Sequence, residues 1–319
     1  MSERHGHGEH GMAAHPEEAS ESPSTRQVAM ERAERSAEPK RTVDAGSTME
    51  LRYPHFRVEP GQQIDLSTMD LNDTGGYARK DQAESAMKAQ HQRIEALQAR
   101  LYAESTQSLL IVLQALDAGG KDGTIRNVFH GVNPQGCRVW SFKQPSSEEL
   151  AHDFLWRYHR KTPPRGMITI FNRSQYEEVL VVRVMKLVPE DVWRQRYQLI
   201  NEFEHMLTRN GTTIVKFFLN ISKEEQKKRL ESRLDTPDKR WKFSRVDLQT
   251  RSLWDDYMAA FQDAINNCST AYAPWYVVPA NHKWYRNLVV ARTIADTLEA
   301  MNPQFPRAEP ESASITSGG

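Results

Sequence analysis

The stretch LIVLQALDAGGKDGTIR, residues 110–126, joins a continuous apolar run to a glycine-rich turn and then to a helical pattern. The apolar run is short and unbroken, as expected for a strand in a parallel sheet that is covered on both faces. The glycines of the turn allow backbone N–H groups to approach an anion, and the following helix adds its partial positive end. The order of strand, turn and helix predicts a phosphate-binding loop.

Segments with helical patterns alternate with short apolar segments along the rest of the chain, which predicts an α/β fold with a mostly parallel, five-stranded sheet flanked by helices. Two capping boxes, Ser146 with Glu149 and Ser222 with Glu225, predict helix starts. Helices are expected over 82–103, from 123 to 130, from 146, near 176–185, and over 192–209, 222–234, 247–267 and 284–301. The expected strands are 108–114, 137–142, 167–171, 213–219 and 275–278.

The loop departs from the usual Walker A pattern, G-x-x-x-x-G-K-[ST], at two positions. Ala115 stands at the first glycine, and Asp122 replaces the Ser or Thr that binds Mg²⁺. Asp117 inside the loop would repel phosphates unless a cation intervenes, so we expect it to hold Mg²⁺. A glycine-rich turn without a ligand is the alternative. The residues expected to bind phosphate here are Ala118, Gly119, Gly120, Lys121, Asp122, Gly123 and Thr124.

Two further segments carry candidate phosphate contacts. In IFNRSQYEEVLVVRV (170–184), Asn172 stands where P-loop enzymes often have a metal-binding Asp, and Arg173 follows it. Residues 227–251 contain nine basic and four acidic side chains, a net charge of +5. Kinases close mobile basic segments over the transferring phosphates, so we predict a helical lid at about 229–246. The alternative for residues 227–251 is a charged, solvent-exposed helix, and the alternative for Arg173 is an ordinary surface arginine.

Composition sets the limits of the domain. The chain has 42 basic and 42 acidic side chains, but residues 1–50 hold only six of the basic and ten of the acidic ones. The segment 1–48 is poor in aromatic and β-branched residues, which predicts a disordered tail, and 307–319 is expected to be a second flexible tail. The kinase domain is therefore expected at 49–306. Two cysteines in no redox spacing and the lack of a signal-peptide or membrane-spanning pattern favour a cytoplasmic protein.

In combination, the motifs resemble the polyphosphate kinase 2 family over about residues 50–305. They are DAGGKDG (117–123), FNRSQYE (171–177), and the stretch from RLESRLDTPDKRWKFSRVDL (229–248) to YAPWYVVPANHKWYRN (272–287). The resemblance implies Mg²⁺-dependent transfer, with Mn²⁺ as a substitute, of a phosphoryl group from inorganic polyphosphate to a nucleotide. Asn172 stands in place of the Asp that is common in the second motif. Together with QALDAGGKDG (114–123), it makes the chain resemble the subgroup that accepts both AMP and ADP. A homodimer or homotetramer is also expected.

The resemblance also assigns roles to residues. Asp117 would hold Mg²⁺ and orient the acceptor, and Lys121 would bind the donor phosphoryl group. Arg173 and Arg233 would clamp phosphate from the core and the lid. Further phosphate contacts are expected from Arg229, Lys239, Arg240 and Lys242. The nucleotide is expected to contact Asn172, Arg173, Tyr176, Glu177 and Glu178, and three aromatic residues would form either a base pocket or core: Trp275, Trp284 and Tyr285.

Two other functions fit parts of the sequence. An ATP-using nucleoside monophosphate kinase, such as a thymidylate kinase, would have the ordinary GK[ST] loop that this chain lacks. A nucleic-acid-binding protein would need groove-reading or stacking elements beside the basic segment, and none is recognisable. We therefore expect neither nucleic acid nor a membrane among the partners.

Overall fold

The computed structural model describes residues 56–238 and 250–307, all within one compact unit, Leu51–Gly319. Its centre is a six-stranded sheet in the order β1-β6-β5-β2-β4-β3. Five strands run parallel and match the five predicted ones: β2 (Ser108–Gln114), β3 (Cys137–Ser141), β4 (Ile168–Asn172), β5 (Thr212–Asn220) and β6 (Trp275–Pro279). The predicted number was one too low, because β1 (Arg57–Val58) pairs antiparallel with β6. Two residues are too few to show a strand period in sequence.

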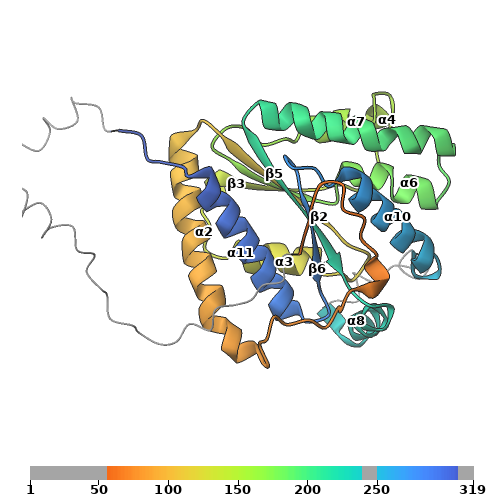
Figure 1. Cartoon of the computed structure of the whole chain (residues 1–319), viewed down its shortest axis with the longest axis horizontal. Helices are drawn as coiled ribbons and strands as arrows, with labels where there is room; N and C mark the ends of the chain where they lie inside the picture. The colour runs from red at the N-terminus through yellow and green to blue at the C-terminus, as the bar shows by residue number, and fades with distance from the viewer. Residues whose placement is uncertain (1–55, 239–249, 308–319) are drawn as a thin grey trace, which may run out of the picture. The chain divides into compact units, whose positions relative to one another are not determined.

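Helices cover both faces of this sheet (Figure 1). On one face α11 packs against α2 and α3, and on the other α10 packs against α7 and α6. Every residue of β2 is buried, which explains its unbroken apolar sequence. The helices of the two layers are α2 (Glu84–Glu104), α3 (Lys121–Val128), α11 (Lys283–Met301), α6 (Val181–Val184), α7 (Glu190–Arg209) and α10 (Trp254–Cys268).

Both serines predicted to start helices do so. Ser146 forms a complete capping box with Glu149 at the start of α4 (Ser147–Leu150). At α8 (Lys223–Asp235), the Ser222 hydroxyl accepts from the Glu225 N–H, while the Glu225 carboxylate accepts from Arg229. The predicted second capping box is therefore only half formed, because the Ser222 N–H donates to Asn281 Oδ1 and the Glu225 carboxylate holds Arg229 instead.

Some helix boundaries differ from the predictions. The predicted helix at 82–103 begins with a 3₁₀ turn, η2 (Lys80–Ala83), and the stretch 176–185 is divided into η4 (Gln175–Glu178) and α6. The N-terminal part of the predicted helix 247–267 lies outside the described residues, as do the tail 1–48, all of the predicted tail 307–319 except Arg307, and residues 239–246 of the predicted lid. The remaining short elements are η1 (Leu66–Thr68), η3 (Pro134–Gly136) and α5 (Trp156–His159). No helix in the described ranges is long and apolar enough to cross a bilayer.

Register brings the motifs together. Leu113 of β2 lies level with Asn172 of β4 and with Phe217 of β5, so three neighbouring parallel strands end at the same edge. Ligands of open α/β sheets bind outside this carboxyl edge. The loop after β2 and the turn after β4 therefore stand side by side at the place where a ligand is expected.

Candidate phosphate-transfer site

A cavity of about 1180 Å³ opens at this carboxyl edge. Its lining comes from segments far apart in the chain: the loop after β2, the end of β4, α8 and the first turn of α11. Most predicted site residues of the described region lie on its wall. They are Asp117, Ala118, Gly120, Lys121, Asp122, Gly123, Asn172, Arg173, Arg229 and Arg233.

The loop after β2 has a backbone that only small residues can follow. Ala118 and Gly120 both have positive φ angles, 63° and 103°. A Cβ on Gly119 would lie 2.5 Å from the Ala115 Cβ and 2.9 Å from the Leu116 carbonyl oxygen. Gly120 is the N-cap of α3, so the loop delivers the N-terminus of that helix to the cavity. Free N–H groups and the helix dipole favour an anion there.

Lys121 folds back over this loop. Its Nζ donates to the Ala115 carbonyl oxygen at 2.7 Å, which holds the amino group at the cavity wall. Burial, followed by the nearby positive charge of Arg173, lowers the pKa of Lys121 to about 8. A bound anion would favour the charged form of the amine and raise this pKa again.

Asp117 and Arg173 connect the two strand ends. Arg173 Nη2 donates to Asp117 Oδ1 at 3.0 Å, and Glu177 lies 3.8 Å from the same guanidinium. The charge of Glu177 raises the pKa of Arg173 against the effect of burial, and Asp117 adds to this rise. Arg173 has a left-handed backbone with φ of 64°, a rare conformation for a residue with a side chain. The sharp turn places its guanidinium over the phosphate loop.

Asn172 and Asp122 form a second link across the same gap. Asn172 Nδ2 donates to Asp122 Oδ1 at 2.8 Å. The residue that replaces the usual Walker Ser or Thr is therefore paired with the residue that replaces the usual Walker B Asp.

Thr124 was expected to bind phosphate, but its side chain is fully buried and does not line the cavity. Its hydroxyl donates to Asn287 Oδ1 at 3.3 Å.

Arg229 is used mainly to hold the loop. It is 6% exposed and donates to the carbonyl oxygens of Ala118, Gly119, Ala280 and Asn281 and to Glu225. All three guanidinium nitrogens of Arg229 thus bond to groups of the protein. We therefore assign Arg229 a supporting role in place of the predicted phosphate contact. Arg286, which sequence reasoning missed, also donates to the Gly119 carbonyl oxygen, at 3.0 Å. Arg286 lies within the motif YAPWYVVPANHKWYRN (272–287), but nothing in that motif indicates a contact with a loop 167 residues earlier in the chain.

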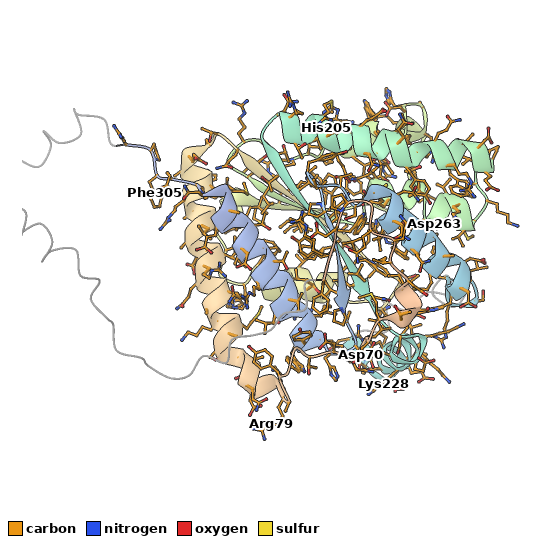
Figure 2. The ribbon with its side chains drawn as sticks, in the orientation of Figure 1. Asp70, Arg79, His205, Lys228, Asp263 and Phe305 are labelled. Carbon is orange, nitrogen blue, oxygen red and sulfur yellow. The ribbon has the colours of Figure 1, made fainter. Side chains whose placement is uncertain are left out.

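The basic wall continues along α8. Lys228 and Arg233 line the cavity with Lys283 and the partly buried Trp284 of α11. Lys228 and Asp70 also line a smaller hollow; Figure 2 labels both residues near α8. The predicted lid residues Lys239, Arg240 and Lys242 lie outside the described residues.

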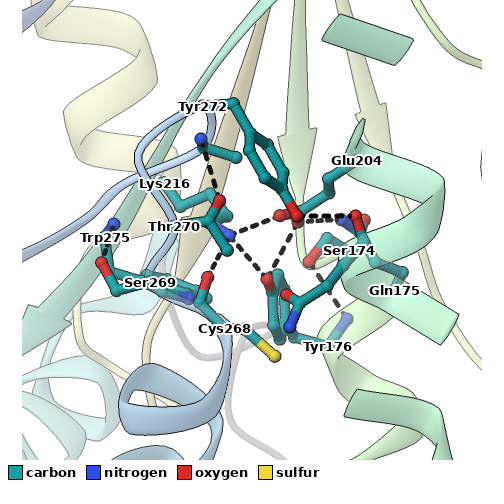
Figure 3. Close-up of polar contacts among 12 residues, drawn as sticks. Ser174, Gln175, Tyr176, Glu204, Lys216, Cys268, Ser269, Thr270, Tyr272 and Trp275 are labelled. Atoms are coloured by element: carbon teal, nitrogen blue, oxygen red, sulfur yellow. Dashed lines mark hydrogen bonds and ion pairs between the residues drawn. The ribbon is translucent and has the colours of Figure 1, made fainter. Parts of the chain in front are cut away.

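The structure corrects the predicted nucleotide contact of Tyr176. Its side chain is fully buried, and its hydroxyl accepts from Lys216 at 2.8 Å and donates to Glu204 at 2.9 Å (Figure 3). The positive φ at Arg173 turns the chain so that the next residues face the core. Trp275 and Tyr285 are likewise core residues.

The two carboxylates that follow Tyr176 also differ from each other. Glu178 is turned toward α7, where Arg196 contacts it at 2.7 Å, and does not line the cavity. Glu177 contacts Arg173 but does not line the cavity. Of the five expected nucleotide contacts, Asn172 and Arg173 therefore remain at the cavity wall.

Comparisons with known proteins agree with this geometry. The model of the family "Polyphosphate kinase 2 (PPK2)" matches residues 77–306. The chain is 54% identical over 261 residues to an AMP/ADP-polyphosphate phosphotransferase of Meiothermus ruber, covering 82% of this chain and 98% of the relative. It is 44% identical to an ADP-polyphosphate phosphotransferase of Rhodopseudomonas palustris, covering 82% and 95%. A crystal structure of polyphosphate kinase 2 from Arthrobacter aurescens TC1 aligns with a TM-score of 0.78 and 43% identity, covering 82% of this chain and 95% of that one.

Proposed function

Because the chain belongs to the polyphosphate kinase 2 family, we propose that it transfers the terminal phosphoryl group of inorganic polyphosphate to AMP and to ADP, forming ADP and ATP. One observation carries the proposal: Asp117, Lys121 and Arg173 meet on the wall of one cavity at the carboxyl edge of the sheet. The names of the Meiothermus and Rhodopseudomonas relatives support polyphosphate as donor and AMP or ADP as acceptor.

The donor phosphate would bind at the loop. Backbone N–H groups at the start of α3 face this region, and Lys121 supplies a full positive charge. Arg173 would bridge phosphate oxygens from the opposite strand, and Arg233 would do so from α8. Three cations around the moving phosphoryl group would stabilise the charge that the transition state carries.

The reaction needs little further from the protein. The acceptor oxygen belongs to a phosphate that is already ionised, so a strong general base is unnecessary. Positioning of donor and acceptor in line supplies most of the rate. Neither a nucleophilic side chain nor a covalent intermediate is required.

The cavity suits Mg²⁺. This ion prefers oxygen ligands and is usually bound by one or two carboxylates together with substrate phosphates and water. Asp117 and Asp122 supply carboxylates on the cavity wall, 18% of the Asp117 side chain is exposed, and Asp117 would be the main protein ligand. The bound ion would neutralise phosphate charge, and Mn²⁺ would replace it with the same ligands. Until it binds, Arg173 neutralises Asp117.

The direct test incubates the full chain with polyphosphate, Mg²⁺ and either AMP or ADP, and identifies the nucleotides by chromatography. We expect ADP and ATP from AMP, and ATP from ADP. Activity on ADP alone would keep the donor and narrow the acceptor, whereas activity only with ATP as donor would favour a nucleoside monophosphate kinase. The comparisons give no support to that alternative.

A homodimer or homotetramer and a cytoplasmic location stay predictions, to be checked by light scattering and cell fractionation.

A further inference from the structure

Two buried arginines meet at the carbonyl side of the phosphate loop. Arg286 of α11 is only 2% exposed, and its Nη1 donates to the Gly119 carbonyl oxygen at 3.0 Å. Arg229 of α8 donates to the same oxygen at 3.2 Å. A single carbonyl group of the loop thus accepts from two guanidinium groups that come from different helices.

Arg286 also fits closely against the loop glycines. A Cβ on Gly120 would lie 2.0 Å from Arg286 Nη1, and one on Gly123 would lie 3.7 Å from Nη2. The guanidinium is held in this position by Asn287, whose Oδ1 accepts from Nε and Nη2 at 3.1 and 2.8 Å. The Thr124 hydroxyl bonds the same oxygen. Arg286 is therefore fixed against the loop from both α3 and α11.

The charges of the two arginines are not balanced in the same way. Arg229 has Glu225 at 2.7 Å, but in the ranges 56–238 and 250–307 no carboxylate lies within 4.0 Å of Arg286. Burial, followed by the charge of Arg229, lowers the pKa of Arg286 to about 9. An unpaired buried cation destabilises a folded protein. Arg286 also lines the cavity, so an anion bound at the loop would lie near enough to offset its charge without direct contact.

We propose that Arg286 is a positioning residue that holds the phosphate loop in its anion-binding conformation and whose buried charge strengthens the binding of the polyphosphate donor. In a trans peptide the C=O and N–H groups point in opposite directions. The bond from Arg286 to the Gly119 carbonyl therefore directs the Gly120 N–H to the other side of the loop, where N–H groups can surround an anion. The proposal rests on the proposed function, because the ligand is the donor of that reaction.

The test uses the full chain with Arg286→Gln and Arg286→Lys. Tripolyphosphate affinity is measured by calorimetry without nucleotide, and melting temperature without ligand. For Arg286→Gln we expect at least about tenfold weaker binding, a raised KM for polyphosphate with a smaller change in kcat, and an equal or higher melting temperature. Arg286→Lys should retain part of the affinity. Arg183→Gln, which breaks a distant pair with Asp263, is the control and should leave the affinity unchanged.

The outcomes separate the two proposals. If wild type binds no tripolyphosphate, the proposed function fails and this inference with it. If wild type binds and Arg286→Gln binds equally well, only the role of Arg286 is overturned, whatever its melting temperature. If Arg286→Gln loses both affinity and stability, the affinity of Arg286→Lys decides. A tripolyphosphate affinity above that of Arg286→Gln supports the role of the charge, and an equal affinity overturns it.

Discussion

The guanidinium of Arg173 lies 3.0 Å from the carboxylate of Asp117, and this ion pair joins the turn after β4 to the phosphate loop after β2. Both side chains face the cavity, so the pair is part of the site as well as a link between strands. A phosphate entering the cavity would compete with Asp117 for Arg173, and a cation would compete with Arg173 for Asp117. Substrate and metal should therefore bind more tightly together than alone.

Asp117→Asn tests this arrangement. The amide keeps the shape and one oxygen but removes the charge that attracts Mg²⁺. We expect turnover to fall at least about 10²-fold and the Mg²⁺ concentration for half-maximal rate to rise. The measurement is rate against Mg²⁺ for both proteins, with Asp263→Asn, which belongs to a distant pair with Arg183, as control. Near-normal turnover with unchanged Mg²⁺ dependence would mean that Asp117 only shapes the loop.

Lys121→Ala should reduce kcat by about 10²–10³-fold, the usual effect of removing one group that stabilises transition-state charge. Within the described residues the amine donates one hydrogen bond, to the Ala115 carbonyl oxygen, so the fold should survive its loss. Circular dichroism and melting temperature check this point, while single-turnover kinetics measure the chemical step. A variant with near-normal rates would remove the phosphate-loop assignment.

The pH dependence of donor binding follows from the same lysine. Its pKa is lowered to about 8, so the ligand-free protein has a charged amine below this pH and a neutral one above it. Anions prefer the charged form; tripolyphosphate affinity should thus be steady below pH 8 and fall above it. Lys121→Arg keeps its positive charge over the whole pH range. The ratio of the wild-type affinity to the Lys121→Arg affinity therefore removes the effect of the ligand's own ionisation. A ratio that is constant from pH 7 to 10 would contradict the prediction.

The sequence predicted those parts of the fold and site that depend on local patterns. The strand at 108–114 agrees with β2 at both ends because an unbroken apolar run between polar residues is visible in one segment. The loop residues Asp117 and Lys121 could be identified from the glycine turn beside them. The family model and the relatives confirm the polyphosphate kinase 2 resemblance that these motifs gave.

The parts that could not be predicted depend on contacts between distant segments or on unusual backbone angles. Nothing in FNRSQYE indicates the positive φ of Arg173, so the burial of Tyr176 was missed. Arg286 belongs to the motif at 272–287, but nothing in that motif indicates that α11 returns to the loop and brings Arg286 to Gly119. The supporting role of Arg229 likewise depends on four carbonyl groups brought together by the fold.

Removal of residues 1–48 should leave kcat, KM and melting temperature nearly unchanged. The segment is rich in Glu, Ser, Ala, Pro and His, and such a composition cannot bury enough apolar surface to offset its ordering entropy. Steady-state kinetics and thermal melting of the shortened and full chains are compared at equal concentration. A large loss of either property would show that the segment docks on the kinase domain.

The buried network around Lys216 provides a test of stability apart from the site (Figure 3). Lys216 and Glu204 are fully buried and form an ion pair, and Lys216 also donates to Tyr176 and to the Cys268 carbonyl oxygen. Gln175 donates to Glu204 at 2.9 Å, so the network holds the residues that follow Arg173.

Lys216→Met would leave the Glu204 carboxylate buried without its cation, and removing one partner of such a pair costs about 3–5 kcal/mol. The double variant Lys216→Met/Glu204→Leu removes both charges and should recover part of this loss, because no unpaired charge stays buried. Recovery should be incomplete, since Tyr176, Gln175 and the Cys268 carbonyl lose hydrogen-bond partners. Denaturant unfolding of the single and double variants measures the difference. The prediction is contradicted if Lys216→Met has the same free energy of unfolding as wild type. It is also contradicted if the double variant is no more stable than Lys216→Met, because the unpaired charge would then not be the cause of the loss.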